Sequence, residues 1–522
     1  MSVKSILIVG GGAAGWLTAA YLAKTLATQA GGVAITLVES KEIGILGVGE
    51  GTFPSIRGTL SAIGADEATF LKASNATFKQ GVKFAHWVRP PGSPGADHYF
   101  HPFSTPSYRG DGLELLPYWL MGDAGGAGFA QAATLQKTVA DAHRGPKRIT
   151  DPAWQGPMNY AYHFDAARFA GFLADEARAL GVAHLYANVD DVLVGEDGNI
   201  SGVVTREAGT LTADLYIDCT GFRAALIGAA LGSPFKSVSD SLFVDRALAI
   251  QAPYAEPDRP IASYTISTAH EAGWTWDIGL PERRGVGYVF SSAHTDETRA
   301  EEVLRGYIGA ESEGLSARLL KFNVGYRETQ WIGNCVAVGL SGGFLEPLES
   351  SGIGLVETAA YLIGHLFPFD GALAPVARQF NAHMSARYAR VVDFLKLHYC
   401  VSQRADSDFW RDNRAETSIP ETLREKLAMW RARPPHRLDF IADLEMYPTS
   451  SWQWVLYGME YATDPAGFAP ACTRHDEARR EFQTIPEVAR RALADLPDHR
   501  ALVAAMHARA GPGLAHARRS AP

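Results

Sequence analysis

A short segment late in the chain concentrates side chains that could do acid–base chemistry. Residues 344–353 read Phe-Leu-Glu-Pro-Leu-Glu-Ser-Ser-Gly-Ile, which sets the carboxylates of Glu346 and Glu349 close to two hydroxyls. The proline restricts Glu346 to extended geometry, whereas Glu349 lies just before a predicted helix start. There it could act as an acid or base, or simply satisfy free N–H groups of the helix. Exposed amides at a helix start also suit a small anion, and Ser351 and Gly352 carry the candidates.

Two lysines near residue 80 could supply a nitrogen nucleophile. Lys79 and Lys83 lie on one face of a single strand predicted over 77–85, because alternate strand residues point the same way. A lysine amine can orient a bound molecule through its hydrogens and, when partly removed from water, becomes nucleophilic. The pattern does not distinguish the two lysines. Without further information, a strand with two solvated lysines is the simpler interpretation.

The N-terminal glycines predict a bound dinucleotide. Gly10, Gly12 and Gly15 form a G-x-G-x-x-G pattern between a strand predicted over 6–9 and a helix predicted over 16–26. Such glycines permit a tight turn, close approach of a pyrophosphate and close packing of helix on strand. Glu39 ends a second predicted strand, at the distance from the glycines where a carboxylate accepts a ribose hydroxyl. A further strand and small-residue turn at 213–221 favours FAD over NAD.

Composition narrows the remaining possibilities to small-molecule chemistry. The chain has 522 residues, 47% of them hydrophobic, and a net charge of −9 from 48 basic and 57 acidic residues, which argues against a nucleic-acid partner. The first strand is too short for a signal sequence or membrane span, so we expect no membrane association and a cytoplasmic location. The four cysteines are widely spaced, which predicts neither disulfides nor a metal site. They are Cys219, Cys335, Cys400 and Cys472.

Several separated motifs resemble the flavin-dependent tryptophan halogenases over nearly the whole chain. The lysine motif and the tryptophan motif are specific to that family, whereas the glycine pattern is shared with many flavoproteins. The motifs are residues 10–16, 47–55, Phe78-Lys79 with Lys83-Phe84 and Trp87, 162–165, 273–278 and 344–353.

The resemblance implies two chemistries in one protein. Reduced FAD from a separate flavin reductase, with oxygen and a halide (bromide or chloride), yields hypohalous acid, which then halogenates an electron-rich aromatic ring. The resemblance implies that Lys79 holds the oxidant and that Glu349 is the catalytic carboxylate. It also implies that the amides of Ser351 and Gly352 bind the halide. The implied FAD contacts are Gly10, Gly12, Ala13, Ala14, Gly15, Glu39, Gly49, Leu340 and Ile353.

Trp274 and Trp276 lie on one face of a predicted strand. Indole rings are large apolar bodies, so the residues alone indicate core packing. The resemblance instead places the pair beside the flavin. Gly279 stands where the family's W-x-W-x-I-P pattern has proline, which loosens the backbone there and indicates a chain outside the best-known subgroup.

The substrate side departs most from the family. His101, Phe103 and Trp454 match aromatic-pocket positions, although a packed loop explains the first two equally well. The segment 430–460 has no recognisable match to the tyrosine pair and acidic stretch that, by the resemblance, hold the backbone of tryptophan in tryptophan-specific relatives. We therefore expect a small aromatic substrate such as indole, or a larger indole-bearing molecule.

The expected fold class is α/β, with a Rossmann-like FAD-binding module of βαβ units and a mixed sheet, interleaved with a largely helical substrate domain. The FAD module is predicted to comprise 1–90, 160–240 and 285–365, and the substrate module 91–159, 241–284 and 366–522. A homodimer is left open. Two rival interpretations are an FAD-dependent aromatic hydroxylase and a non-catalytic flavin-binding protein, and neither explains a lysine and a glutamate set apart from the flavin by two tryptophans.

Overall fold

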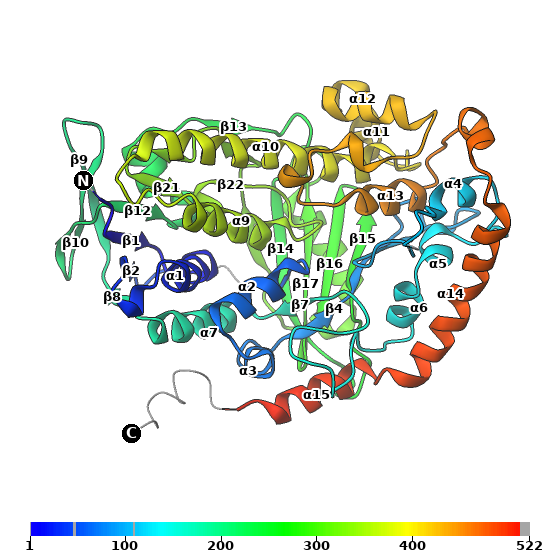
Figure 1. Ribbon diagram of the computed structural model, residues 1–522, viewed down its shortest axis with the longest axis horizontal. Helices are drawn as coiled ribbons and strands as arrows, with labels where there is room; N and C mark the ends of the chain where they lie inside the picture. Colours follow the sequence, from blue (N-terminus) through cyan, green and yellow to red (C-terminus); the bar gives the residue numbers. More distant parts are fainter. Residues whose placement is uncertain (1, 45–48, 108–109, 512–522) are drawn as a thin grey trace.

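The computed structural model describes residues 2–44, 49–107 and 110–511. The first layer of the fold is a six-stranded sheet. The strand order is β20-β21-β12-β1-β2-β8, and neighbouring strands are parallel except for β20 and β21. Helices α1, α7 and α9 pack together beside it (Figure 1). The bounds are β1 Ser5–Val9, β2 Ala34–Glu39, β8 Ala183–Tyr186, β12 Leu215–Asp218, β20 Trp331–Ile332, β21 Cys335–Ala337, α1 Ala13–Thr25, α7 Ala166–Ala179 and α9 Ser351–His365.

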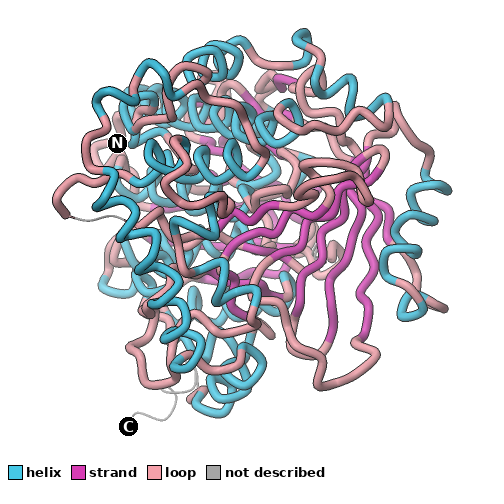
Figure 2. Tube along the Cα trace, turned by 90° about the vertical axis from the view of Figure 1, so that its right-hand side faces the viewer, coloured by secondary structure: helices cyan, strands magenta, loops and turns pink. Residues whose placement is uncertain are grey.

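A seven-stranded sheet forms the second layer, and Figure 2 shows its strands fanning out. Its order is β18-β14-β17-β16-β15-β5-β6, antiparallel except between β15 and β5. One continuous hydrophobic core contains residues from both sheets, such as Ile6 and Trp274. The strands are β5 Gly81–Ala85, β6 Tyr99–Pro102, β14 Arg246–Pro253, β15 Thr265–His270, β16 Gly273–Gly279, β17 Arg283–Phe290 and β18 Arg318–Lys321.

Three small sheets accompany the two large ones in the described residues, and one of them carries Lys79. That sheet has the order β3-β7-β4, with Lys79 at the end of β4 and opposite Ala161 of β7. The others have the orders β11-β10-β9 and β13-β19-β22. The strands are β3 Glu50–Gly51, β4 Thr77–Lys79, β7 Ala161–Phe164, β9 Val189–Val194, β10 Ile200–Thr205, β11 Gly209–Leu211, β13 Phe235–Ser237, β19 Gly325–Arg327 and β22 Gly343–Phe344.

The C-terminal third is mostly helical. In Figure 1, α14 and α15 run down the right side and along the base, and α10 lies above α9. Within the described ranges, no helix combines the length and apolar content that a membrane span requires. The remaining helices are α2 Ser55–Ile63, α3 Glu67–Ala73, α4 Leu115–Leu120, α5 Phe129–Ala133, α6 Gln136–Asp141, α8 Glu297–Ile308, α10 Leu373–Cys400, α11 Asp408–Arg414, α12 Glu421–Trp430, α13 Thr449–Gly458, α14 His475–Asp495 and α15 His499–Arg509.

The α/β fold class and the first βαβ unit are confirmed, but one predicted strand is wrong. Residues 77–85 form two strands in different sheets, because the N–H of Gln80 leaves the ladder and donates to the carbonyl of Ser263 at 2.6 Å. The predicted modules also share a sheet: β5 pairs with β15, and β17 runs across the predicted boundary at 284/285. The module boundaries stay a prediction.

Candidate active site

Lys79 is the buried lysine of the two candidates. Its Nζ donates a hydrogen bond of 2.8 Å to Ser350 Oγ and lies 5.4 Å from the centre of the Phe103 ring. Burial lowers the pKa of Lys79 to about 8, although the charge of Glu349 acts in the opposite direction. Lys83 is half-buried, with its Nζ 3.9 Å from Asp141. Burial therefore brings the proton equilibrium of Lys79 close to neutral pH.

Glu349 is held ionised by two histidines. Its Oε1 lies 2.7 Å from His101 Nδ1 on β6 and 2.9 Å from His398 Nε2 on α10. Burial alone would raise the pKa of this carboxyl, but the two histidines outweigh it and lower the pKa to about 2. Glu349 is therefore a fixed carboxylate close enough to Lys79 to influence its charge.

Glu346 occupies a different environment. Its Oε2 accepts hydrogen bonds from Trp274 Nε1 at 3.0 Å and Tyr399 Oη at 2.5 Å. Burial raises the pKa of Glu346 to about 7, with smaller opposing effects from these donors. The two glutamates of one segment thus ionise in different pH ranges, because one faces two histidines and the other is buried against neutral donors.

The start of α9 lies beside both catalytic candidates. Ser350 adopts a left-handed backbone, with φ of 59°, and the helix begins at Ser351. Ser350 Oγ accepts from Lys79, so the lysine is tied to this turn. A side chain at Gly352 would meet no atom within 4 Å. Free amides at a helix start next to a lysine suit the anion expected at Ser351 and Gly352.

The glycine loop is shaped to receive a dinucleotide. A Cβ at Gly10 would lie 2.2 Å from the carbonyl oxygen of Cys219, and one at Gly15 would lie 1.9 Å from that of Gly10. A Cβ at Gly12 would meet no atom within 4 Å, and α1 begins directly after it without a capping side chain. The loop is thus packed against the protein on one side and open at the helix start, as a pyrophosphate requires.

Other predicted cofactor contacts surround this loop. Gly11 was not among the predicted contacts, but a Cβ there would lie 1.7 Å from Glu39 Oε2. The other carboxylate oxygen, Glu39 Oε1, lies 2.8 Å from His184 Nε2. The turn Gly339–Ser341, which contains Leu340, packs on Ala14 beside Ala13.

Ile353 is buried in the first turn of α9, and Gly49 has φ of 99°. Gly47 and Val48 of the same motif lie outside the described residues. In the predicted strand and turn at 213–221, Asp218 at the end of β12 accepts hydrogen bonds from the backbone amides of Leu226 and Ile227, so its role is structural.

Trp274 and Trp276 are both buried in β16, with ring centres 6.5 Å apart. Gly287 on β17 makes room for the second ring, since a Cβ there would lie 2.2 Å from Trp276. The carbonyl of Gly279 accepts a hydrogen bond of 2.7 Å from Thr77 Oγ1. The tryptophan strand is therefore tied directly to the strand that carries Lys79.

The three predicted pocket residues converge from β6 and α13. His101 Nε2 lies 2.9 Å from Ser451 Oγ, and Trp454 Nε1 donates to the carbonyl of Ser104 at 3.1 Å. The ring of Trp454 also packs on Phe129, with centres 4.6 Å apart. Phe103 lies near Lys79. Phe103 therefore lies beside the lysine and His101 beside the carboxylate, whereas Trp454 packs against Phe129 and Ser104 more tightly than an open slot requires.

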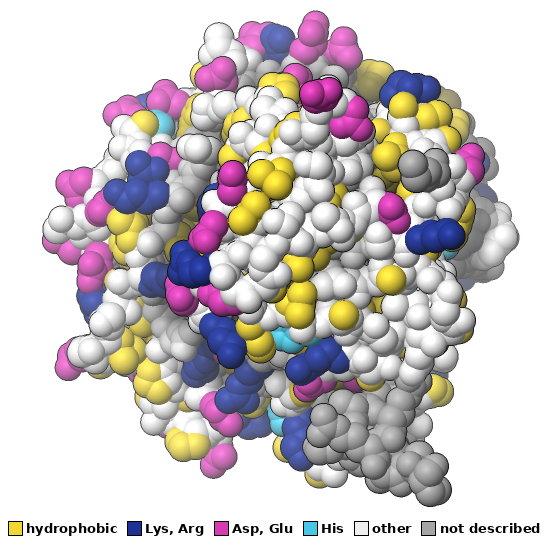
Figure 3. Space-filling model, turned by 90° about the vertical axis from the view of Figure 1, so that its left-hand side faces the viewer, with side chains coloured by type: hydrophobic (Ala, Val, Ile, Leu, Met, Phe, Trp, Pro, Cys, Tyr) yellow, Lys and Arg dark blue, Asp and Glu magenta, His cyan; other side chains and the backbone are white. Residues whose placement is uncertain are grey.

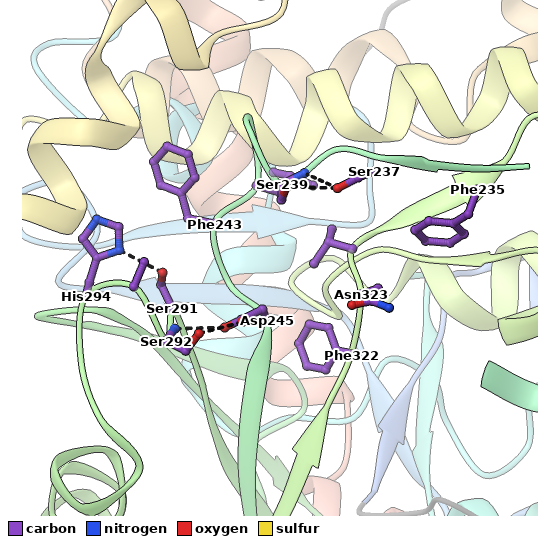
Figure 4. A pocket seen from close by; sticks show the side chains of 13 residues that line it. Phe235, Ser237, Ser239, Phe243, Asp245, Ser291, Ser292, His294, Phe322 and Asn323 are labelled. Atoms are coloured by element: carbon purple, nitrogen blue, oxygen red, sulfur yellow. Dashed lines mark hydrogen bonds between the residues drawn. The ribbon is translucent and has the colours of Figure 1, made fainter. Parts of the chain in front are cut away.

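A separate surface cavity of about 400 Å³ contains none of these residues (Figure 4). Phe243 forms part of its wall, and the Nζ of buried Lys396 lies 4.7 Å from the Phe243 ring centre. Figure 3 shows acidic and basic side chains interspersed on the face that it draws. Neither feature brings together the predicted site residues, so the candidate site is the buried junction of Lys79, Glu349 and the start of α9.

Sequence reasoning missed His398, Ser350 and Ser451 as parts of this junction. Ser350 stood within the recognised segment and could have been found by its place next to Glu349. His398 lies 49 residues beyond Glu349, on the 28-residue helix α10, and no local pattern connects the two. Only packing of α10 over the turn brings them together.

A dinucleotide loop, a buried lysine and a buried carboxylate define an α/β enzyme with a nucleotide cofactor. Comparisons with known proteins identify the family: the tryptophan halogenase model matches residues 5–473. The chain is 35% identical to tryptophan 6-halogenase SttH of Streptomyces toxytricini, covering 96% of this chain and 98% of that protein.

Two solved structures agree with this match. A tryptophan halogenase from Shewanella frigidimarina has a TM-score of 0.93 and 39% identity, covering 98% of this chain and 99% of that chain. BrvH, a flavin-dependent halogenase from Brevundimonas sp. BAL3, has a TM-score of 0.85 and 34% identity over 96% of this chain and 99% of that one. The chain belongs to the tryptophan halogenase family and is a flavin-dependent halogenase.

Proposed function

We propose that this protein uses reduced FAD, oxygen and a halide to make hypohalous acid, and halogenates indole or an indole-bearing molecule. A separate flavin reductase supplies the reduced FAD. When bound, the flavin delivers with oxygen the two-electron oxidation that converts halide into hypohalous acid. The glycine loop and the open start of α1 would hold its pyrophosphate. The expected halide site is the start of α9, at the amides of Ser351 and Gly352.

The junction of Lys79, Ser350 and Glu349 carries this proposal. Lys79 donates to Ser350 Oγ at 2.8 Å, so its amine is held at the helix start where the halide is expected. Its remaining hydrogens can orient the oxygen of hypohalous acid. As the new carbon–halogen bond forms, the oxygen–halogen bond breaks and the oxygen takes a proton from the charged Lys79 amine to leave as water. The carboxylate of Glu349 accepts the proton lost from the ring.

Charges in the segment 430–460 favour indole over free tryptophan. An amino-acid substrate needs a carboxylate free to bind its ammonium group. Here Asp439 pairs with Arg433, Glu445 with Arg390 at 2.7 Å, and Glu460 with Arg89. The remaining acid, Asp443, is solvent-exposed. Acids already paired with arginines are poor anchors for a second cation.

Without such an anchor, the intrinsic reactivity of the substrate decides which carbon is halogenated. In indole this is the electron-rich carbon of the five-membered ring. Bromide should serve at least as well as chloride, because bromide is more easily oxidised and Gly352 presents no side chain to limit the ion's size. The cytoplasmic location remains a prediction, and a homodimer remains open.

Mass spectrometry of one reaction tests the proposal. The purified protein, a flavin reductase, FAD, oxygen, bromide and equal concentrations of indole and tryptophan should give mainly bromoindole. Equal bromide and chloride then test the halide preference. A clear preference for tryptophan, with attack on the benzo ring, would show that 430–460 contains an amino-acid anchor and would refute the substrate proposal. A hydroxylated product would refute the halogenation itself.

A further inference from the structure

The two hydrogen bonds of the His398 ring limit which protonation states His398 and Glu349 can adopt together. Its Nδ1 lies 2.8 Å from the carbonyl oxygen of Phe394, and its Nε2 lies 2.9 Å from Glu349 Oε1. A carbonyl oxygen can only accept, so Nδ1 must carry a proton. The second contact then joins either an imidazolium to a carboxylate or a neutral ring to a carboxylic acid.

The surrounding contacts favour the imidazolium and carboxylate. His101 places Nδ1 2.7 Å from the same Oε1, and Ser451 Oγ can donate to its other nitrogen at 2.9 Å. One oxygen that receives two nitrogen donors is best satisfied as part of an ionised carboxylate. Burial raises the pKa of Glu349, yet the histidines overcome this and bring it to about 2.

His398 is enclosed by aromatic rings rather than by water. The side chain is fully buried, and the rings of Phe84 and Phe394 both have their centres 5.0 Å from the imidazole centre. The rings of Trp87 and Tyr99 lie slightly further away, at 6.3 and 6.4 Å. Aromatic rings can stabilise a cation that has lost its water.

We propose that His398 is a positioning residue for the halogenation step: as an imidazolium it keeps Glu349 ionised and fixes Oε1, leaving Oε2 for the reacting molecule. This inference rests on the proposed function of Glu349. Glu349 also interacts with Lys79, Tyr99 and Tyr447, and it contacts His101. His398 differs from His101 because its other ring nitrogen donates a hydrogen bond to a backbone carbonyl.

The variant His398→Gln separates charge from packing. Glutamine can still donate to Glu349 but carries no charge, so the pKa of Glu349 should rise by about 1–3 units. The low-pH limb of the single-turnover halogenation rate should move upward in pH, and kcat should fall about tenfold or more. KM should change little, since His398 acts through Glu349. His398→Leu, which also removes the donor, should be slower still.

Controls distinguish positioning from general damage. His294→Gln replaces a histidine whose partners are Ser291 and Asp412, outside the candidate site, and should keep the wild-type rate and pH profile. Nitrogen NMR of histidine-labelled wild-type protein, without flavin, should show both ring nitrogens of His398 protonated near neutral pH. The signal is assigned by its loss in His398→Gln.

Two results would overturn the inference. One is a His398→Gln enzyme with the wild-type kcat and pH profile, and the other is a His398 ring with only one protonated nitrogen. A wild-type protein that halogenates nothing would refute the proposed function instead, and the NMR result would still decide the charge of His398.

Discussion

Replacing Lys79 with methionine should abolish halogenation and yet stabilise the protein. In the folded chain burial lowers the pKa of Lys79 from 10.5 to about 8, which corresponds to roughly 3 kcal/mol of unfavourable free energy for the charged form. Methionine removes that term but also loses the hydrogen bond to Ser350, worth about 1–2 kcal/mol. The variant should therefore be more stable at neutral pH by about 1–2 kcal/mol.

The sign of this effect depends on pH. Below about pH 8 the lysine is charged in both the folded and the unfolded chain, so its burial destabilises the folded protein by the full amount. Between about pH 8 and 10.5 only the unfolded chain holds the proton. The stability of the wild-type protein therefore rises with pH over this range. The advantage of Lys79→Met should shrink over that window.

Urea unfolding midpoints across pH, together with product and peroxide assays, measure both effects. The variant should still oxidise reduced flavin and release peroxide. Lys83→Met, at a half-exposed position, should change stability by less than about 0.5 kcal/mol. A Lys79→Met protein that is less stable than wild type at neutral pH, or that still halogenates, would refute the reasoning.

Three further outcomes are expected. Glu349→Gln should slow halogenation about 10²–10⁴-fold in single-turnover assays, and Glu346→Gln should be milder; the reverse order would exchange their roles. Halogenation should fall as pH rises through about 8, where Lys79 loses its proton, whereas a rate that rises there would indicate a neutral amine that carries the halogen covalently. Gly12→Ala should weaken FAD binding about tenfold or more in a fluorescence titration, because the new Cβ would enter the open space of the loop. As a control, Gly58→Ala on α2 should bind FAD normally, since a Cβ there also meets no atom within 4 Å.

Local sequence was enough to predict the nucleotide loop and the start of α9. At Gly10 and Gly15 the backbone of other residues comes within 2.2 Å of where a Cβ would stand, so these positions require glycine. Glu39 also stands at the end of β2 as expected. These features depend on residues that are neighbours in the chain, and neighbouring residues carry their own conformational preferences.

The choice between Lys79 and Lys83 could not be made from the residues. Both were expected on one face of one strand, and the family resemblance alone favoured Lys79. The structure separates them because Gln80 bonds to Ser263, a residue far along the chain, and sends Lys79 and Lys83 into different sheets. Burial, which lowers the pKa of Lys79, follows from that separation.

The sequence by itself thus determined the class of cofactor, the two candidate carboxylates and the family, since these depend on short motifs with their own geometry. Tertiary structure decided the pH range in which each of these groups ionises. Glu346 and Glu349 are separated by two residues, yet one faces Trp274 and Tyr399 and the other faces His101 and His398. A pKa depends on burial and on the charges that packing brings near, and packing joins residues that lie far apart in the chain.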